Sequence, residues 1–312
     1  MEVVALLQTA LPDTGPFTVG QSLAWATDTL ARAGTDSPRL DAELLLGLSL
    51  GWTRERIYAN PQDILGPEAK ERFRSLLTRR AEGEPCAYIT GHREFWSLDF
   101  LVTPAVLVPR PETERLVEIV LEYLDGFKEQ AGPRILDLGT GSGAIAVALA
   151  KERRDLKIYA TDLSAAALAI ARANARRHGV DERVRFIQGD TFDPVKDFRE
   201  SFHGIVSNPP YVKRSEMGAL PGEVLREPGL ALDGGADGLD LYRRIVPGAL
   251  LYLRENGFLA LEMAPDMARD LSSLFDTSDG YLGVSVFRDG PGRDRVICAR
   301  KSCRAAKPGR KG

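Results

Sequence analysis

Short strand and helix patterns alternate from Arg134 to about residue 299, and this alternation constrains the fold more than any other feature of the chain. It predicts an α/β fold, a Rossmann-like and mostly parallel sheet with helices on both faces. In such sheets, ligands bind beyond the carboxyl ends of the strands. Strands are expected at 134–138, 157–161, 184–188, 204–207 and 257–262, with shorter ones near 282–287 and 295–299; helices are expected at about 143–152, 164–178, 238–254 and 265–275.

A helical region precedes this alternation. Thr18 and Gln21 fit a capping box at one helix start, and two further helices are expected to begin at Pro38 and Pro67. The buried stripe of the second helix is predicted from its leucines, which are Leu40, Leu44, Leu45 and Leu48.

Residues 86–110 change character, since Tyr88, Ile89, Phe95 and Trp96 are strand formers. We therefore expect a β-hairpin that links two domains. The predicted organisation is a helical domain at 1–84, a hairpin linker at 85–110, an α/β domain at 111–300 and a basic, disordered tail at 301–312.

Composition excludes several classes of protein. No apolar run approaches the roughly 18 residues of a membrane span. The start of the chain lacks the basic residues of a secretory signal, and the three cysteines lack disulfide or metal-ligand spacing, so we expect a cytoplasmic protein without a metal site. The formal net charge of −3 argues against a general nucleic-acid binder.

The stretch Asn208-Pro209-Pro210-Tyr211 ends the fourth predicted strand of the α/β region. Neither proline can donate a ladder hydrogen bond, so the strand stops in a stiff turn. Such a turn can grip a planar –NH2 group: the Asn208 side-chain oxygen and the Pro209 carbonyl accept its hydrogens, and Tyr211 covers its plane. The alternative is a strand-ending turn with a packed tyrosine. The candidate catalytic residues are Asn208, Pro209 and Tyr211, and Pro210 joins them as a candidate substrate contact.

A glycine-rich segment follows the first strand of the α/β region and opens a helix. Glycines let the backbone turn tightly and approach a ligand, and a helix start offers unpaired N–H groups. The same segment satisfies the dinucleotide pattern, so alone it does not separate NAD from S-adenosylmethionine. Its candidate cofactor contacts are Asp137, Gly139, Thr140, Gly141, Ser142 and Gly143.

Acidic residues follow the next two strands. Asp162 can accept both hydroxyls of a ribose, Asp190 can meet an adenine amine, and Phe192 can stack on the base; Thr191 is a further candidate cofactor contact. The alternative for each aspartate is a helix cap or turn residue. Asp137 before the glycines and Asn208, a further candidate cofactor contact, favour S-adenosylmethionine, because a hydride-transfer enzyme has no evident use for an –NH2 clamp.

These residues resemble the bacterial HemK-type glutamine methyltransferases that act on peptide chain release factors. The resemblance runs from about residue 20 to 300. It is carried by Gly83–Pro85, Tyr88–Gly91, Arg93–Trp96, Val108–Glu114, Asp137–Gly143, Asn208–Tyr211, Glu227-Pro228, Ala231-Leu232 and Asp237–Leu239. The chain departs from the family pattern at Ala264-Pro265-Asp266, where glycine and then glutamine are usual.

The resemblance implies a class I, S-adenosylmethionine-dependent methyltransferase domain and a helical domain that recognises the substrate. It implies methylation of the side-chain amide nitrogen of the glutamine in a release factor's Gly-Gly-Gln motif, with no stable nucleic-acid binding and no membrane. Three alternatives remain open: methylation of a ribosomal-protein glutamine, methylation of an adenine amine in DNA, and a non-catalytic binding module.

Overall fold

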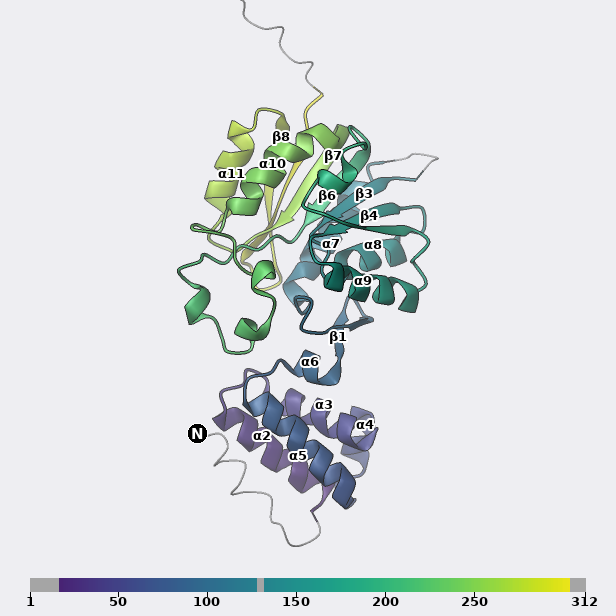
Figure 1. Ribbon diagram of the computed structural model, residues 1–312, viewed down its shortest axis with the longest axis vertical. Helices are drawn as coiled ribbons and strands as arrows, with labels where there is room; N and C mark the ends of the chain where they lie inside the picture. The colour runs from purple at the N-terminus through teal and green to yellow at the C-terminus, as the bar shows by residue number, and fades with distance from the viewer. Residues whose placement is uncertain (1–16, 128–131, 304–312) are drawn as a thin grey trace, which may run out of the picture. The chain divides into compact units, whose positions relative to one another are not determined.

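The structure is a computed structural model that describes residues 17–127 and 132–303 (Figure 1). The chain divides into two compact units. One runs to His92 and also takes in Leu220–Arg226, and the other runs from Arg93 to Ala219 and on from Glu227. Residues 304–312, most of the predicted tail, lie outside the described part. Among the helices described, none is both long and apolar enough to span a membrane.

The first unit is helical. Its elements are α2 (Val19–Arg32), α3 (Pro38–Leu50), α4 (Arg54–Ala59), α5 (Pro67–Ala81), α6 (Cys86–Thr90) and the 3₁₀ turn η4 (Val224–Arg226). The predicted capping box is confirmed, since the Gln21 N–H donates to Thr18 Oγ1 at 3.2 Å and the Thr18 N–H donates to Gln21 Oε1 at 3.0 Å. The predicted helix starts at Pro38 and Pro67 are confirmed as well.

The buried face of α3 differs from the predicted leucine stripe. Leu40 and Leu44 are 40% and 38% exposed, whereas Leu45 and Leu46 are fully buried. The prediction of Leu40 and Leu44 as core residues was wrong because α3 carries leucines around most of its circumference. The pattern of this helix therefore does not select one face, and packing against α2 and α5 does.

A buried arginine joins distant segments of the first unit. Arg80 is 4% exposed. It donates to Asp41 Oδ2 at 2.6 Å and forms an ion pair with Glu223 Oε2 at 2.6 Å. Arg226 adds a hydrogen bond to the Glu82 carbonyl at 2.6 Å. A segment about 140 residues further along the chain is thereby held to α5 by charge-assisted hydrogen bonds.

The predicted hairpin is confirmed only in part. Strands β1 (His92–Phe95) and β2 (Leu98–Leu101) pair through a turn in which Trp96 and Ser97 both have positive φ, as a primed hairpin turn requires. Tyr88 and Ile89 instead lie in α6. Their strand-forming character was overridden because Pro85 and Gly91 delimit a single helical turn whose apolar side chains are buried.

A seven-stranded sheet organises the second unit. The strand order is β5-β4-β3-β6-β7-β9-β8, with β9 antiparallel to β7 and β8 antiparallel to β9. The other neighbours are parallel, so the predicted mostly parallel sheet is confirmed. The strands are β3 (Arg134–Leu138), β4 (Lys157–Asp162), β5 (Val184–Gln188), β6 (Phe202–Ser207), β7 (Leu253–Glu262), β8 (Tyr281–Arg288) and β9 (Asp294–Lys301).

Helices cover both faces of this sheet (Figure 1). Alternate residues of one strand point to opposite faces: Ile135 packs in the cluster that contains α7 and α8, and Leu136 packs in the cluster that contains α10 and α11. The helices are α7 (Glu114–Leu124), α8 (Ala144–Glu152), α9 (Ala165–Arg177), α10 (Asp240–Tyr252) and α11 (Ala268–Thr277), with 3₁₀ turns η1 (Pro111–Thr113), η2 (Asp193–Val195), η3 (Met217–Ala219) and η5 (Gly229–Ala231).

Gly204 in β6 provides a test of this packing. A Cβ at Gly204 would lie 2.4 Å from Phe258 Cζ on the paired strand, and Phe258 is fully buried. We expect Gly204→Ala to lower the free energy of unfolding by about 1–3 kcal/mol through overpacking, as measured by urea denaturation. Gly218→Ala is the control, because its added Cβ would meet no atom within 4 Å. Equal stability of the two variants would contradict the packing argument.

Candidate active site

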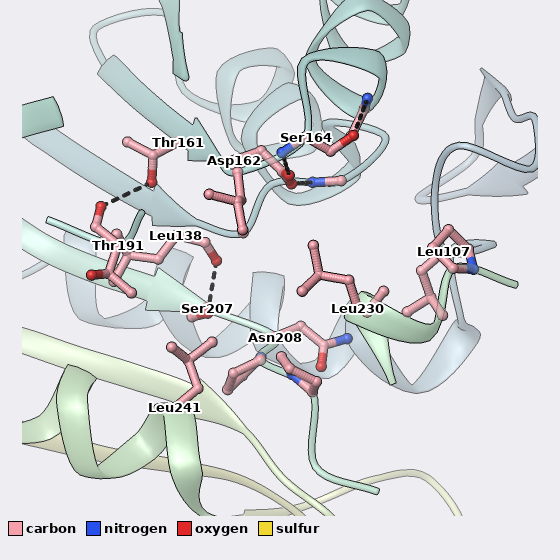
Figure 2. Close-up of a pocket in the computed structure, with 18 of the residues that line it drawn as sticks. Leu107, Leu138, Thr161, Asp162, Ser164, Thr191, Ser207, Asn208, Leu230 and Leu241 are labelled. Carbon is pink, nitrogen blue, oxygen red and sulfur yellow. Dashed lines mark hydrogen bonds between the residues drawn. The ribbon is translucent and has the colours of Figure 1, made fainter. Parts of the chain in front are cut away.

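A cavity of about 390 Å³ lies at the carboxyl ends of β3, β4, β5 and β6 in the second unit (Figure 2). The strand order reverses here, since β4 and β5 extend to one side of β3 while β6 and β7 extend to the other. Ligands of open α/β sheets bind at such a switch point. Residues at or just after the strand ends that line the cavity are Leu138, Gly139, Gly141, Thr161, Asp162, Gly189, Asp190, Thr191, Ser207 and Asn208.

The glycines after β3 serve two different needs. Gly139 and Gly141 line the cavity with φ of +69° and +56°, and a Cβ added at either would meet no atom within 4 Å. Their requirement is therefore conformational, and the side facing the cavity is open. Gly143 also has a positive φ, but its added Cβ would lie 3.1 Å from Ala171 Cβ. Gly143 thus lets α8 approach α9.

Asp137 supports this loop from beneath. Its side chain is fully buried and does not line the cavity. Asp137 Oδ2 accepts a hydrogen bond from Thr140 Oγ1 at 2.6 Å. Burial raises the pKa of Asp137 to about 7, against the lowering effect of Thr140. Thr140 and Ser142 are also buried, so of this predicted segment only the two glycines, with Leu138, face the cavity.

Asp162 accepts two backbone N–H groups next to the cavity. Its Oδ2 accepts the Gly141 N–H and its Oδ1 accepts the Ser164 N–H, both at 2.8 Å. Ser164 then caps α9 by accepting the Ala167 N–H at 3.1 Å. Asp162 also lines the cavity (Figure 2), so one carboxylate fixes the glycine loop and remains accessible to a ligand.

The segment after β5 supplies two of its three predicted residues to the cavity wall. Asp190 and Thr191 line the cavity, and both accept from Arg244 Nη2, at 2.8 and 3.3 Å. Arg244 is not among the predicted site residues, because it lies 54 residues from Asp190 and has no local signal. Phe192 does not line the cavity: its ring stacks on Tyr252 at 4.7 Å and is 8% exposed. The Phe192 ring, which was predicted to stack on the base, therefore packs in the core and does not face the cavity.

The turn after β6 brings Asn208, Pro209 and Pro210 to the cavity wall. The Asn208 amino group donates to Thr113 Oγ1 at 3.2 Å. The amide oxygen Oδ1 of Asn208 is therefore not the atom that bonds to Thr113. Tyr211 is not among the lining residues. Its ring packs against the cluster on the α10 side, and burial raises its pKa to about 12. The structure thus gathers three of the four predicted clamp residues.

Two further loops line the cavity, and neither was predicted to belong to the site. One supplies Ala105, Val106 and Leu107, and the other supplies Pro228, Leu230 and Ala231. Glu227 connects the loops: it is 5% exposed, accepts the Val108 N–H at 2.9 Å and pairs with Arg110. The signal was available in the Val108–Glu114 and Glu227-Pro228 motifs, which were noted only as family features.

Two family models match separate parts of the chain. Residues 21–91 match the PrmC N-terminal domain, and residues 118–236 match the methyltransferase small domain. The release factor glutamine methyltransferase of Moorella thermoacetica is 46% identical over 91% of this chain and 98% of its own length. The protein of that name from Geobacter sulfurreducens is 41% identical over 91% of this chain and 97% of its own length.

Solved structures agree on the fold. The hMettl16 catalytic domain, in complex with MAT2A 3′UTR hairpin 6, has a TM-score of 0.55 at 16% identity and covers 74% of this chain and 82% of its own. Human methyltransferase 10 domain containing protein has a TM-score of 0.50 at 18% identity and covers 68% and 92%. These likenesses show a methyltransferase fold. The identity of 46% and 41% to the two relatives, over nearly their full length, goes further and shows that this chain belongs to the release factor glutamine methyltransferase family.

Proposed function

We propose that this chain transfers the methyl group of S-adenosylmethionine to the side-chain amide nitrogen of the glutamine in the Gly-Gly-Gln motif of peptide chain release factors. The family membership supports the reaction and the substrate class. The observation that carries the proposal is the placement of Asn208 at the cavity wall, with its amino group committed to Thr113 and its oxygen left to accept a substrate N–H.

The cavity residues fit S-adenosylmethionine. The open backbone of Gly139 and Gly141 admits the methionine part, the Asp162 carboxylate suits two ribose hydroxyls, and Asp190 stands at the next strand end for the base. A cavity of about 390 Å³ falls within the size of small-molecule sites. When bound, the cofactor supplies an electrophilic methyl group on a sulfonium.

The chain's own residues then act on the substrate amide. An amide lone pair is delocalised into its carbonyl, which makes the nitrogen a poor nucleophile. Asn208 Oδ1 and the Pro209 carbonyl accept hydrogen bonds from the two N–H groups, which raises electron density at nitrogen and orients its lone pair. The nitrogen that gains the methyl group then gives up one N–H proton to solvent. Catalysis then depends on the positioning of the substrate amide and on electrostatic interactions in a preorganised site. Mass spectrometry of release factors incubated with enzyme and cofactor tests the reaction, and no mass increase on any Gly-Gly-Gln peptide would refute it.

The remaining assignments belong to the same proposal. The helical domain at 1–84 binds the release factor and does no chemistry, which its match to the PrmC N-terminal domain supports. The hairpin at 85–110 links it to the methyltransferase domain at 111–300. We expect a cytoplasmic enzyme without stable nucleic-acid binding, in keeping with a formal net charge of −3.

Asp162→Ala tests the cofactor assignment. The change removes the proposed ribose acceptor, and a charge-assisted hydrogen bond contributes about 1.5–3 kcal/mol at most, so we expect weaker S-adenosylmethionine binding by calorimetry. The variant also frees the Gly141 N–H, and a thermal melt records that effect separately. Asp181→Ala, at an exposed turn, is the control. Unchanged affinity in a folded Asp162→Ala protein would remove Asp162 from the cofactor site.

Asn208→Ala tests the clamp. We expect turnover to fall by roughly 10²–10³, the scale of one preorganised polar contact in a transition state. Cofactor affinity should fall much less, because the glycine loop and Asp162 supply most of that binding. Single-turnover rates beside thermal melts make the measurement, with Asn60→Ala in the first unit as control. A purely structural Asn208 would instead lower stability and leave the rate per folded molecule near the wild-type value.

A further inference from the structure

Glu262 is a buried carboxyl that the proposed reaction does not use. It is the last residue of β7. Ser207 of β6 pairs with Leu261 of the parallel strand β7, and Asn208 and Glu262 are the residues that directly follow this pair. Glu262 is 0% exposed. Neither carboxyl oxygen has a hydrogen bond of ordinary geometry within the described residues. A buried polar group in this condition requires an explanation, and functional sites are where such groups occur.

The groups around this carboxyl belong to several elements. Burial raises the pKa of Glu262 to about 7, opposed by the neighbouring Thr113 hydroxyl, by Arg295 and by Asn208. The charged and titratable side chains that face it are Glu112 from η1, Tyr211 after β6, Tyr242 from α10 and Arg295 from β9. Arg295 donates through Nη2 to Asp289 Oδ2 at 3.3 Å and through Nη1 to the Met263 carbonyl at 3.5 Å, and its buried Nε has no hydrogen-bond partner within the described residues.

Thr113 adjoins both Glu262 and Asn208. It precedes α7 as the capping residue, yet its side chain makes no cap hydrogen bond. Its hydroxyl instead accepts the Asn208 amino group at 3.2 Å. Thr113 is 5% exposed, so water does not compete freely for this hydroxyl. Glu262 and Thr113 are thus buried polar side chains that adjoin Asn208, which lines the cavity.

A hydroxyl has a single hydrogen to donate, and this fact couples the three residues. When Glu262 is ionised, the Thr113 hydrogen is drawn to the carboxylate, and only lone pairs remain for Asn208. The carboxamide must then present its amino group to Thr113 and its oxygen to the cavity. When Glu262 is protonated, the Thr113 hydrogen is released, and the reversed carboxamide becomes equally acceptable.

We propose that Glu262 is a positioning residue that acts through Thr113, its carboxylate keeping the Asn208 carboxamide oxygen turned toward the cavity. For the substrate this rests on the proposed function: a reversed Asn208 would place donors against the donors of the glutamine –NH2 group. The orientation itself is a property of the protein and can be measured without substrate.

The first test uses nuclear magnetic resonance. The side-chain ¹⁵N–¹H signals of Asn208, identified by their loss in Asn208→Asp, are followed from about pH 6 to about pH 8. In the wild type we expect a shift with a midpoint near the pKa of Glu262, about 7. Glu262→Gln and Thr113→Val should each abolish it. Asp137 titrates in the same range and is retained in both variants, so a shift that persists in Glu262→Gln would overturn the proposal.

The second test uses the reaction. Wild-type kcat should rise from about pH 6 to about pH 8 as Glu262 ionises, whereas kcat of Glu262→Gln should be low and flat. Thr113→Val should lower kcat by about tenfold with cofactor Kd within about threefold, and Thr113→Ser, which keeps the hydroxyl, should restore most of the rate.

The outcomes separate the two proposals. Variants that melt earlier but keep the wild-type kcat and pH profile would show that Glu262 has only a structural role. A wild-type enzyme that methylates no release factor would refute the proposed function, and the Asn208 resonances would still decide the role of Glu262.

Discussion

The parallel pairing of β3 with β6 is the constraint on which the candidate site depends. Leu138 lies opposite Ser207, and the Ser207 hydroxyl donates to the Leu138 carbonyl at 2.7 Å. The glycine loop and the Asn208 turn follow these residues on their two strands. Segments separated by about 70 residues therefore emerge side by side at one edge of the sheet. A change of register here would separate the proposed cofactor loop from the proposed clamp.

Burial of carboxyl groups is the second feature of this edge. Asp137 and Glu262 are both fully buried, and burial raises the pKa of each to about 7. A buried charge opposes folding unless hydrogen bonds offset its desolvation. Each carboxyl lies behind a residue of the cavity wall, Asp137 behind the glycine loop and Glu262 behind Asn208. The sheet thus retains polar groups in its core where they can orient the site.

Loops, together with α9 and α10, enclose the remaining sides of the cavity. Glu227 holds the segment at Val108–Arg110 to the segment that contains Leu230, and the Val212 N–H bonds the Leu232 carbonyl at 3.0 Å. Leu230 is 62% exposed although it lines the cavity. An exposed apolar side chain at the rim suits contact with a macromolecular substrate, whereas the strand ends suit a small cofactor.

The amino-acid sequence by itself determined the α/β class, the strand positions to within a few residues, and the family. Hydrophobic periodicity, helix caps and prolines act over short distances, so they can be recognised locally: Thr18, Pro67 and Asn208 are examples. Tertiary structure alone decided which side chains face the cavity. Phe192 packs in the core, and Leu40 is exposed to solvent. Arg244, Glu227 and Thr113 lie at the site. Those placements depend on contacts between residues far apart in the chain; no local pattern marks Arg244, and the motifs that contain Glu227 and Thr113 do not by themselves give their positions in space.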